Sequence, residues 1–325
     1  MQQEKKTYIP IPKGRGITAY LIKRGLVLVA IVLGITFLVF SLIKALPGDP
    51  VVGLLGQRAD PEDIKRIGSA LGVDKPFLVQ YTGFVTLVLR GDLGRSYYSN
   101  RDVVREIGHK LPNTIALATA AMTLGLVFGV VFGFVAGVNN GGYLDRVFSV
   151  LSLVGLSVPV FWSGLMLMAL LSLKLDLLPP SGTAGMRYVI LPAITLSLPA
   201  SATIARVVRA SVIDTLRQPF VRFLTAKGLT RRRILGIHVL KNILIPLITI
   251  VGLDFGSFLN GSVLTETIFG WDGIGRYTVE GIFKRDYPVV MGCILTGSAV
   301  FVLINTLVDI AYHYVDPRLR SSTTR

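Results

Sequence analysis

Six long apolar runs constrain this 325-residue chain more than any other feature of its sequence. Each run is nearly free of Asp, Glu, Lys and Arg, and each is close to or above the roughly 20 apolar residues that a bilayer-spanning helix needs. Helices that are apolar on every face for this length are rare in water-soluble proteins. The runs therefore predict an all-α polytopic membrane protein with six transmembrane helices, at residues 25–43, 111–138, 147–173, 188–205, 242–265 and 287–315.

The first run has two readings, a cleaved signal peptide or a permanent transmembrane helix. It follows 24 residues, exceeds the usual apolar core of a signal peptide, and is not followed by a small-x-small cleavage site. We therefore expect an uncleaved first span. The predicted organisation is an N-terminal segment at 1–24, a membrane domain at 25–315 and a C-terminal tail at 316–325.

The positive charge of the chain is concentrated on one predicted side of the membrane. The formal net charge is +15, from 34 Lys and Arg residues against 19 Asp and Glu residues. Six spans place both termini on the same side, and that side holds 19 of the basic residues but only 4 of the acidic ones. Because cytoplasmic loops carry the excess of Lys and Arg, we predict that both termini are cytoplasmic. Topology and anionic lipid thus explain the basic composition, and nucleic-acid binding is not expected because no basic patch is interleaved with exposed aromatic residues.

The segment between the first and second spans, residues 44–110, is too long to be a structureless connection. A helix start at Pro61 has acidic residues ahead of basic ones, and Gly72 is suited to end that helix. Residues 76–89 show a second pattern of helical spacing. The segment therefore predicts a small helical external lobe.

The segment between the fourth and fifth spans, residues 206–241, has the opposite character, with nine basic residues and one acidic residue. Residues 218–226 are expected to form a helix, and Gly228 is suited to cap its end. A capped basic helix with apolar side chains on the cytoplasmic face is typical of a docking element for another protein. The alternative is a helix that lies on the lipid surface.

Four glycines in the second span recur at intervals of four residues, on one face of the expected helix: Gly125, Gly129, Gly133 and Gly137. This small-xxx-small pattern lets two helix backbones approach closely. A pore-lining face is the alternative interpretation. We expect helix packing, because glycine offers a substrate no side-chain chemistry.

The sequence contains no P-loop, no zinc-protease motif and no nucleophile-elbow motif. Its three histidines and one cysteine show no metal-ligand spacing. We therefore expect neither enzymatic activity nor a cofactor in this chain. Within the fifth span, Asp254 is an intramembrane acid with Asn260 on about the same face, and both are candidates for a transport path because acids at this depth are costly.

Several segments, taken in order, resemble the permease subunits of binding-protein-dependent ABC importers in the peptide/nickel group, and in particular the B-type subunits of oligopeptide and dipeptide permeases. The resemblance runs through nearly the whole chain. It is carried by Leu46-Pro47-Gly48-Asp49-Pro50, Gly91-Asp92-Leu93-Gly94-Arg95-Ser96, Leu111-Pro112-Asn113-Thr114, Ser157-Val158-Pro159-Val160-Phe161-Trp162, Glu266-Thr267-Ile268-Phe269-Gly270-Trp271 and Asp316-Pro317-Arg318.

The signature loop of this family has the form Glu-Ala-Ala-x-x-x-Gly. Gly228 matches its glycine, whereas Arg222, Phe223 and Leu224 stand at the Glu-Ala-Ala positions, which is a departure. The resemblance implies that this loop is a coupling helix that docks in a groove of an ATPase subunit. Its expected coupling residues are Phe220, Arg222, Phe223, Leu224, Ala226, Lys227 and Gly228, with Phe220, Phe223 and Leu224 inserting and the two basic side chains meeting acidic rims.

The resemblance further implies a type I ABC importer permease in a bacterial-type inner membrane, which forms the pathway for peptide uptake with a homologous second permease. An external substrate-binding protein would deliver the peptide, and partner ATPase subunits would hold ATP and Mg. Nickel or another small solute is the rival substrate, although the spans offer few His or acidic side chains to a metal. A secondary transporter or channel, and a membrane scaffold without transport, are the rival classes.

Overall fold

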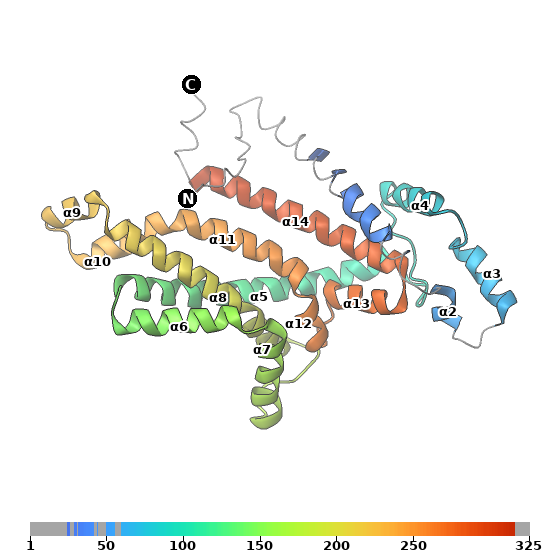
Figure 1. Cartoon of the computed structure of the whole chain (residues 1–325), viewed down its shortest axis with the longest axis horizontal. Helices are drawn as coiled ribbons and strands as arrows, with labels where there is room; N and C mark the ends of the chain where they lie inside the picture. The colour runs from blue at the N-terminus through green and yellow to red at the C-terminus, as the bar shows by residue number, and fades with distance from the viewer. Residues whose placement is uncertain are drawn as a thin grey trace, which may run out of the picture.

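The computed structural model describes residues 25–26, 29–30, 32–41, 44, 50–55 and 60–315 (Figure 1). Across this described part the regular secondary structure is helical, and one isolated β-bridge pairs Arg95 with Asp102. The predicted all-α fold class is therefore confirmed. The two predicted terminal segments, 1–24 and 316–325, lie outside the described residues.

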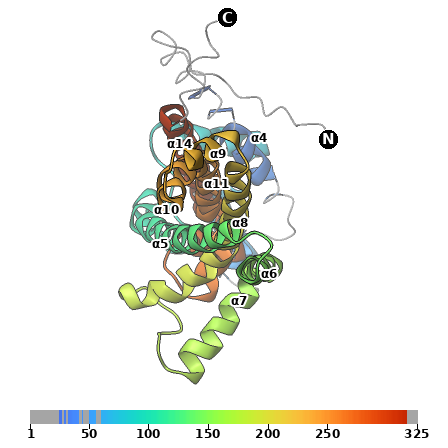
Figure 2. The same ribbon diagram turned by 90° about the vertical axis from the view of Figure 1, so that its left-hand side faces the viewer.

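Four helices in the described part of the chain are long and apolar enough to cross a membrane. They are α5 (Val103–Val138), α8 (Met186–Leu216), a continuous helix made of α10 (Arg231–Arg233), η2 (Ile234–Val239) and α11 (Leu240–Gly261), and α14 (Tyr287–Val315). Figure 2 shows these helices end-on as one bundle. The first run is described only in part, as the short helical segment Val32–Ser41, so the count of six spans stays a prediction.

The third run is not the single straight helix that the sequence predicts for residues 147–173. It forms α6 (Tyr143–Ser157), then α7 (Val160–Leu167) and η1 (Met168–Lys174), with a bend of 103° between the two halves. The break lies at Val158, whose ψ of 126° is extended, and at Pro159, which is the N-cap of α7. A residue before proline is disfavoured in the helical region, so this dipeptide ends one helix and starts another. Figure 1 shows α7 pointing away from the bundle.

Three of the spans are longer than the apolar runs that predict them. The helix made of α10, η2 and α11 begins at Arg231 rather than at residue 242. Helix α8 continues to Leu216, so the predicted loop 206–241 begins inside a helix. Helix α5 already begins at Val103, where the carboxylate of Asp102 accepts a hydrogen bond from the backbone N–H of Arg105 at 2.9 Å. These extensions contain charged residues. A prediction from apolar runs alone therefore does not include them.

Helices α5 and α8 pack along most of their lengths, and the four regularly spaced glycines of α5 lie in this contact. A Cβ atom added to Gly129 would lie 2.7 Å from the Cβ of Ile204, and one added to Gly137 would lie 2.6 Å from that of Val212. At Gly133 the added atom would overlap the backbone of α8 itself. Glycine is thus required where the two backbones meet.

Replacing Gly133 with Ala is expected to lower the free energy of unfolding by about 1–3 kcal/mol, because the methyl group would push α5 and α8 apart. Thermal unfolding of the purified protein in detergent measures the change. Gly108→Ala is the matched control. Gly108 belongs to the same helix, and no atom lies within 4 Å of a Cβ added there. Equal stability of the Gly133→Ala variant and the parent protein would show that the contact is loose.

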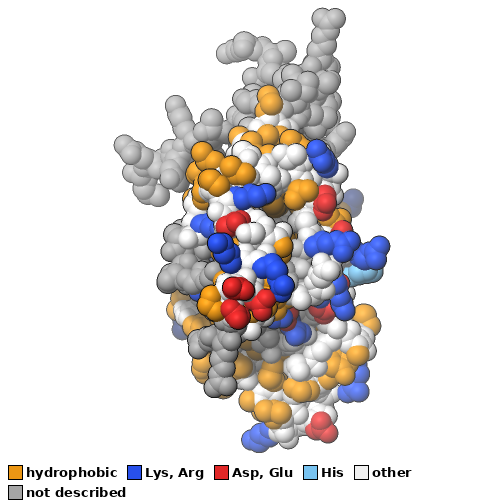
Figure 3. Space-filling model, turned by 90° about the vertical axis from the view of Figure 1, so that its right-hand side faces the viewer, with side chains coloured by type: hydrophobic (Ala, Val, Ile, Leu, Met, Phe, Trp, Pro, Cys, Tyr) orange, Lys and Arg blue, Asp and Glu red, His pale blue; other side chains and the backbone are white. Residues whose placement is uncertain are grey.

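One end of the bundle carries five short helices, opposite the end at which α9 lies (Figure 1). They are α2 (Pro50–Leu55), α3 (Pro61–Leu71), α4 (Phe77–Leu89), α12 (Val263–Ile268) and α13 (Ile274–Lys284). Helix α3 begins at Pro61 and ends at the left-handed Gly72, as the sequence predicts. Figure 3 shows acidic and basic side chains intermixed on this end of the molecule.

Candidate functional site

Helix α9 (Pro219–Ala226) lies at the tip of the loop between α8 and α10, at one end of the bundle (Figure 1). Pro219 occupies its first turn, where its missing N–H costs nothing. Gly228 ends the helix with φ +82°, donating its N–H to the Thr225 carbonyl at 3.0 Å. The N–H of Leu229 reaches back to the Leu224 carbonyl at 3.2 Å, which completes a Schellman cap. The predicted helix and its glycine cap are both present.

The two faces of α9 differ in what they contact. Val221 is buried, and Phe220 and Leu224 pack, partly buried, against the core of the chain itself. The ring of Phe223, in contrast, is 58% exposed, and the Lys227 ammonium lies 4.7 Å from its centroid. Of the three apolar side chains expected to insert into a partner, the structure leaves one, Phe223, on the outer surface of α9.

The outer surface of this loop is strongly basic. Phe223 is flanked by exposed Arg222, Ala226, Lys227 and Gly228, and the following turn carries exposed Arg231, Arg232 and Arg233. Asp214 is the one acidic residue between 206 and 241. We define the basic α9 surface as Arg222, Phe223, Ala226, Lys227 and Gly228. An exposed aromatic side chain with basic neighbours can pack in an apolar groove that has acidic rims.

Asp254 lies within α11, on the helix that follows this loop. Its Oδ2 atom is buried and accepts no hydrogen bond from any described residue. The neighbouring glycines bring α11 close to α14: a Cβ added to Gly256 would lie 3.0 Å from the Phe301 ring. Asn260 belongs to the same helix, and its side chain lies outside the described residues. The structure therefore places Asp254 inside the helix bundle and does not test its proximity to Asn260.

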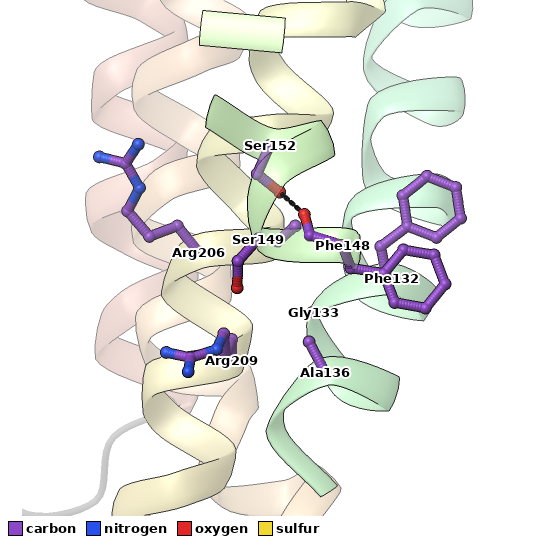
Figure 4. A pocket seen from close by; sticks show the side chains of 9 residues that line it. Phe132, Gly133, Ala136, Phe148, Ser149, Ser152, Arg206 and Arg209 are labelled. Atoms are coloured by element: carbon purple, nitrogen blue, oxygen red, sulfur yellow. Dashed lines mark hydrogen bonds between the residues drawn. The ribbon is translucent and has the colours of Figure 1, made fainter. Parts of the chain in front are cut away.

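A small cavity of about 210 Å³, lined by both apolar and polar residues, lies between α5, α6 and α8 (Figure 4). At its edge the Arg209 guanidinium donates to the buried Asp145 carboxylate at 2.8 Å. The same carboxylate accepts from the backbone N–H of Gly141 at 2.8 Å. This ion pair ties the turn between α5 and α6 to α8, and the sequence offered no signal for it because the partners are 64 residues apart.

A cluster around Glu266 joins three elements at the opposite end of the bundle. Glu266 is completely buried, and its carboxylate accepts hydrogen bonds from the hydroxyls of Thr114 at 2.8 Å and Ser262 at 3.0 Å. It also accepts from the backbone N–H of Arg276 at 3.0 Å. Burial raises the pKa of Glu266, and these donors partly offset that shift. We call these four residues the Glu266 cluster.

Further contacts extend the junction from the Glu266 cluster. The Trp271 indole N–H donates to the Asn113 carbonyl at 3.0 Å, and the Asn113 amide donates to the Asp272 carbonyl at 2.8 Å. Nearby, the buried Asp286 accepts from the Ser96 hydroxyl at 2.5 Å. The motifs at residues 91–96, 111–114 and 266–271, which are far apart in the sequence, therefore lie in one junction. The sequence alone predicts no role for their residues.

Metal binding finds no support among the residues that the structure describes. No group of three or more His, Cys, Asp or Glu side chains comes together in this part of the chain. The arrangement as a whole consists of a helix bundle with an internal acid, the basic α9 surface at one end and a hydrogen-bonded junction at the other.

Known families and proteins resemble this chain over most of its length. The family described as "Binding-protein-dependent transport system inner membrane component" matches residues 129–321, and the N-terminal part of such membrane components matches residues 17–118. The dipeptide transport system permease protein DppB of Alkalihalophilus pseudofirmus is 37% identical over 330 residues, covering 93% of this chain and 99% of the relative. The glutathione transport system permease protein GsiC of Pectobacterium atrosepticum is 39% identical over 301 residues, covering 93% and 98%.

Solved structures share the fold. A structure of the inward-facing MetNI methionine ABC transporter has a TM-score of 0.57 at 17% identity, covering 65% of this chain and 96% of that chain. A structure of an amino acid ABC transporter with histidines has a TM-score of 0.51 at 16% identity, covering 65% and 94%. At these identities the likeness concerns the fold alone.

Proposed function

The chain belongs to the family of binding-protein-dependent transport system inner membrane components, and on that premise we propose that it is the permease subunit of an ATP-driven peptide importer. The proposal that the substrate is a peptide rests on full-length similarity to permease proteins of dipeptide and glutathione transport systems. Both relatives are named for transport of short peptides. A multi-pass inner membrane location follows from the family and from the apolar helices.

We propose that the basic α9 surface docks on an ATPase subunit and couples the permease to ATP. ATP and Mg would be bound by partner ATPase subunits, since this chain has no P-loop. The exposed ring of Phe223 would enter an apolar groove, and Arg222 and Lys227 would meet acidic side chains at its rim. Because α9 is held by a glycine cap and by its buried face, movement of the ATPase would be transmitted to α8 and α10.

The other end of the bundle is proposed to face the outside. Basic residues are concentrated in the α8–α10 loop, which supports a cytoplasmic position for that loop and for both termini. An external binding protein would then deliver peptide at the end that carries α3 and α13. A homologous second permease would complete the pathway, as the family premise implies.

Asp254 and Asn260 are proposed to line the substrate path. Asp254→Asn is expected to lower uptake of a labelled dipeptide about tenfold, or ~1.4 kcal/mol, because the variant cannot pair with the peptide ammonium group. Folding should be preserved, since the amide has nearly the same shape and removes a charge from an apolar setting. Ser257→Ala, on an exposed position of the same helix, is the control. Unchanged uptake by the Asp254→Asn variant would remove this residue from the path.

Uptake by cells with and without this chain tests the proposed substrate class. A labelled dipeptide and labelled nickel are supplied in parallel. We expect deletion to abolish dipeptide uptake and to leave nickel uptake unchanged. Loss of nickel uptake with normal dipeptide uptake would retain the permease and overturn the peptide assignment.

A further inference from the structure

Helix α4 lacks the charged residues that are expected of a helix facing water. Its thirteen residues, Phe77–Leu89, contain no Asp, Glu, Lys, Arg or His. Charged residues begin immediately outside it, with Asp74 and Lys75 on one side and Arg90 and Asp92 on the other. Helix α3 in the same lobe is ordinary, since exposed Glu62, Lys65 and Arg66 face outward.

The outward face of α4 is also apolar. None of its thirteen residues, all of which the structure describes, is buried by the rest of the protein. Leu78 is 65% exposed, Val79 50% and Leu89 82%. An apolar helix of 10–14 residues is expected to be a buried core helix or an inserted membrane segment. Because the side chains of α4 are exposed, α4 is not a buried core helix of this chain.

Every polar side chain of α4 with a hydrogen to donate bonds to a backbone carbonyl. The donors and their acceptors are Gln80 to Val73 at 2.9 Å and Lys75 at 2.6 Å, Tyr81 to Leu33 at 3.0 Å, Thr82 to Leu78 at 2.8 Å, and Thr86 to Thr82 at 2.8 Å. A helix in water does not require such internal partners. In hydrocarbon, where no water can replace them, each unsatisfied polar group costs several kcal/mol.

The inner face of α4 packs against the helical segment Val32–Ser41, which belongs to the first apolar run. The Phe77 ring lies 5.2 Å from that of Phe40, and the Tyr81 ring lies 5.3 Å from that of Phe37. Tyr81 reaches the carbonyl of Leu33, ten residues before the end of the predicted first span, which is about 15 Å along a helix. Figure 1 shows the two helices beside each other, at the end of the bundle opposite α9.

The apolar surface of α4 is continuous with that of this first-span segment. Leu33, Phe37 and Leu38 are exposed on the segment, as Leu78 and Val79 are on α4. Between the two helices and α14 lies an apolar cavity of about 230 Å³ whose wall includes Val32, Phe84 and Leu295. The apolar surface of a segment that the sequence predicts to span the membrane thus extends onto α4.

We infer that α4 is inserted into the outer leaflet of the membrane, with phospholipid acyl chains covering Leu78, Val79, Leu87 and Leu89. A helix lying on the membrane surface would present a charged face to water, and α4 has none. At about 20 Å it is too short to cross the hydrocarbon core of about 30 Å, so the chain enters and leaves on the same side. The external lobe is therefore anchored in lipid through α4, and α3 presents its charged surface to water. The choice of the outer leaflet rests on the proposed orientation of the chain, whereas insertion itself does not depend on the proposed substrate or on ATP coupling.

Site-directed labelling tests the insertion in the full-length protein in phospholipid vesicles. The chain has one cysteine, the buried Cys293, so Cys293→Ala gives a background without reactive thiols. Leu78→Cys and Val79→Cys introduce sites on α4, and Lys65→Cys on α3 is the matched control in the same lobe. Each site is labelled with the fluorophore NBD and exposed to aqueous iodide or to phospholipids with nitroxide-labelled acyl chains.

At positions 78 and 79 we expect quenching by nitroxide lipids and iodide quenching at least fivefold weaker than at position 65. Strong quenching by iodide with none by nitroxide lipid would place α4 in water and overturn the inference. Protection from both quenchers would mean that protein covers the helix, which also overturns it. Two independent positions on α4 ensure that a misfolded variant does not decide the result.

Discussion

Replacing Glu266 with Ala is expected to lower the free energy of unfolding by at least about 3 kcal/mol. The variant would leave the hydroxyls of Thr114 and Ser262 and the N–H of Arg276 buried without an acceptor. Each buried unsatisfied donor costs about 1–3 kcal/mol. Thermal unfolding of the purified protein in detergent measures the loss, and a lower yield of folded protein should accompany it.

A second carboxylate in the same region provides the control. Glu280 lies on α13 and pairs with Arg276 at 2.9 Å, but its side chain is 43% exposed. Exposed ion pairs contribute about 0–1 kcal/mol, so Glu280→Ala should change stability little. If both variants lose the same stability, the Glu266 cluster is not the element that holds α5, α12 and α13 together.

Replacing Phe223 with Asp is expected to reduce ATP-driven peptide uptake at least tenfold while the permease still inserts and folds. The ring is exposed, so the fold does not depend on it, whereas the proposed docking would lose its apolar contact and gain an acid facing acidic rims. Uptake by cells and the amount of ATPase that copurifies with the permease measure the two effects.

The conservative variant Phe223→Leu separates loss of docking from general damage. Leucine keeps an apolar side chain in the groove and should retain most of the uptake. Normal uptake by the Phe223→Asp variant, or equal losses for Asp and Leu, would contradict the assignment of α9 as the coupling element.

The local features of this fold were predictable from the sequence because they depend on near neighbours. The N–H of Gly228 bonds to the carbonyl three positions earlier, and the N–H of Leu229 bonds to the carbonyl five positions earlier. A single glycine after a short helix predicts such a cap. The glycine repeat of α5 likewise indicated a close contact, which the structure shows against α8. The bend at Val158 and Pro159 was present in the sequence as a local signal, but the continuous apolar run outweighed it.

Features that depend on distant partners were not predictable. Thr114 and Glu266 are 152 residues apart, and nothing in either local pattern indicates that they meet. The inward packing of Phe220 and Leu224 also depends on the tertiary core, because a helix of eight residues offers apolar side chains on more than one face. The external lobe was predicted as a helical unit, but a pattern of helical spacing in α4 did not distinguish a water-facing helix from an inserted one.

The most direct test of the central claim is uptake of a labelled dipeptide by proteoliposomes that contain the complete transporter, with binding protein outside and ATP enclosed. If the chain is the permease of an ATP-driven importer, peptide accumulates only when both ATP and binding protein are present. Equal uptake without enclosed ATP would contradict the account and identify the chain as part of a channel or a secondary transporter.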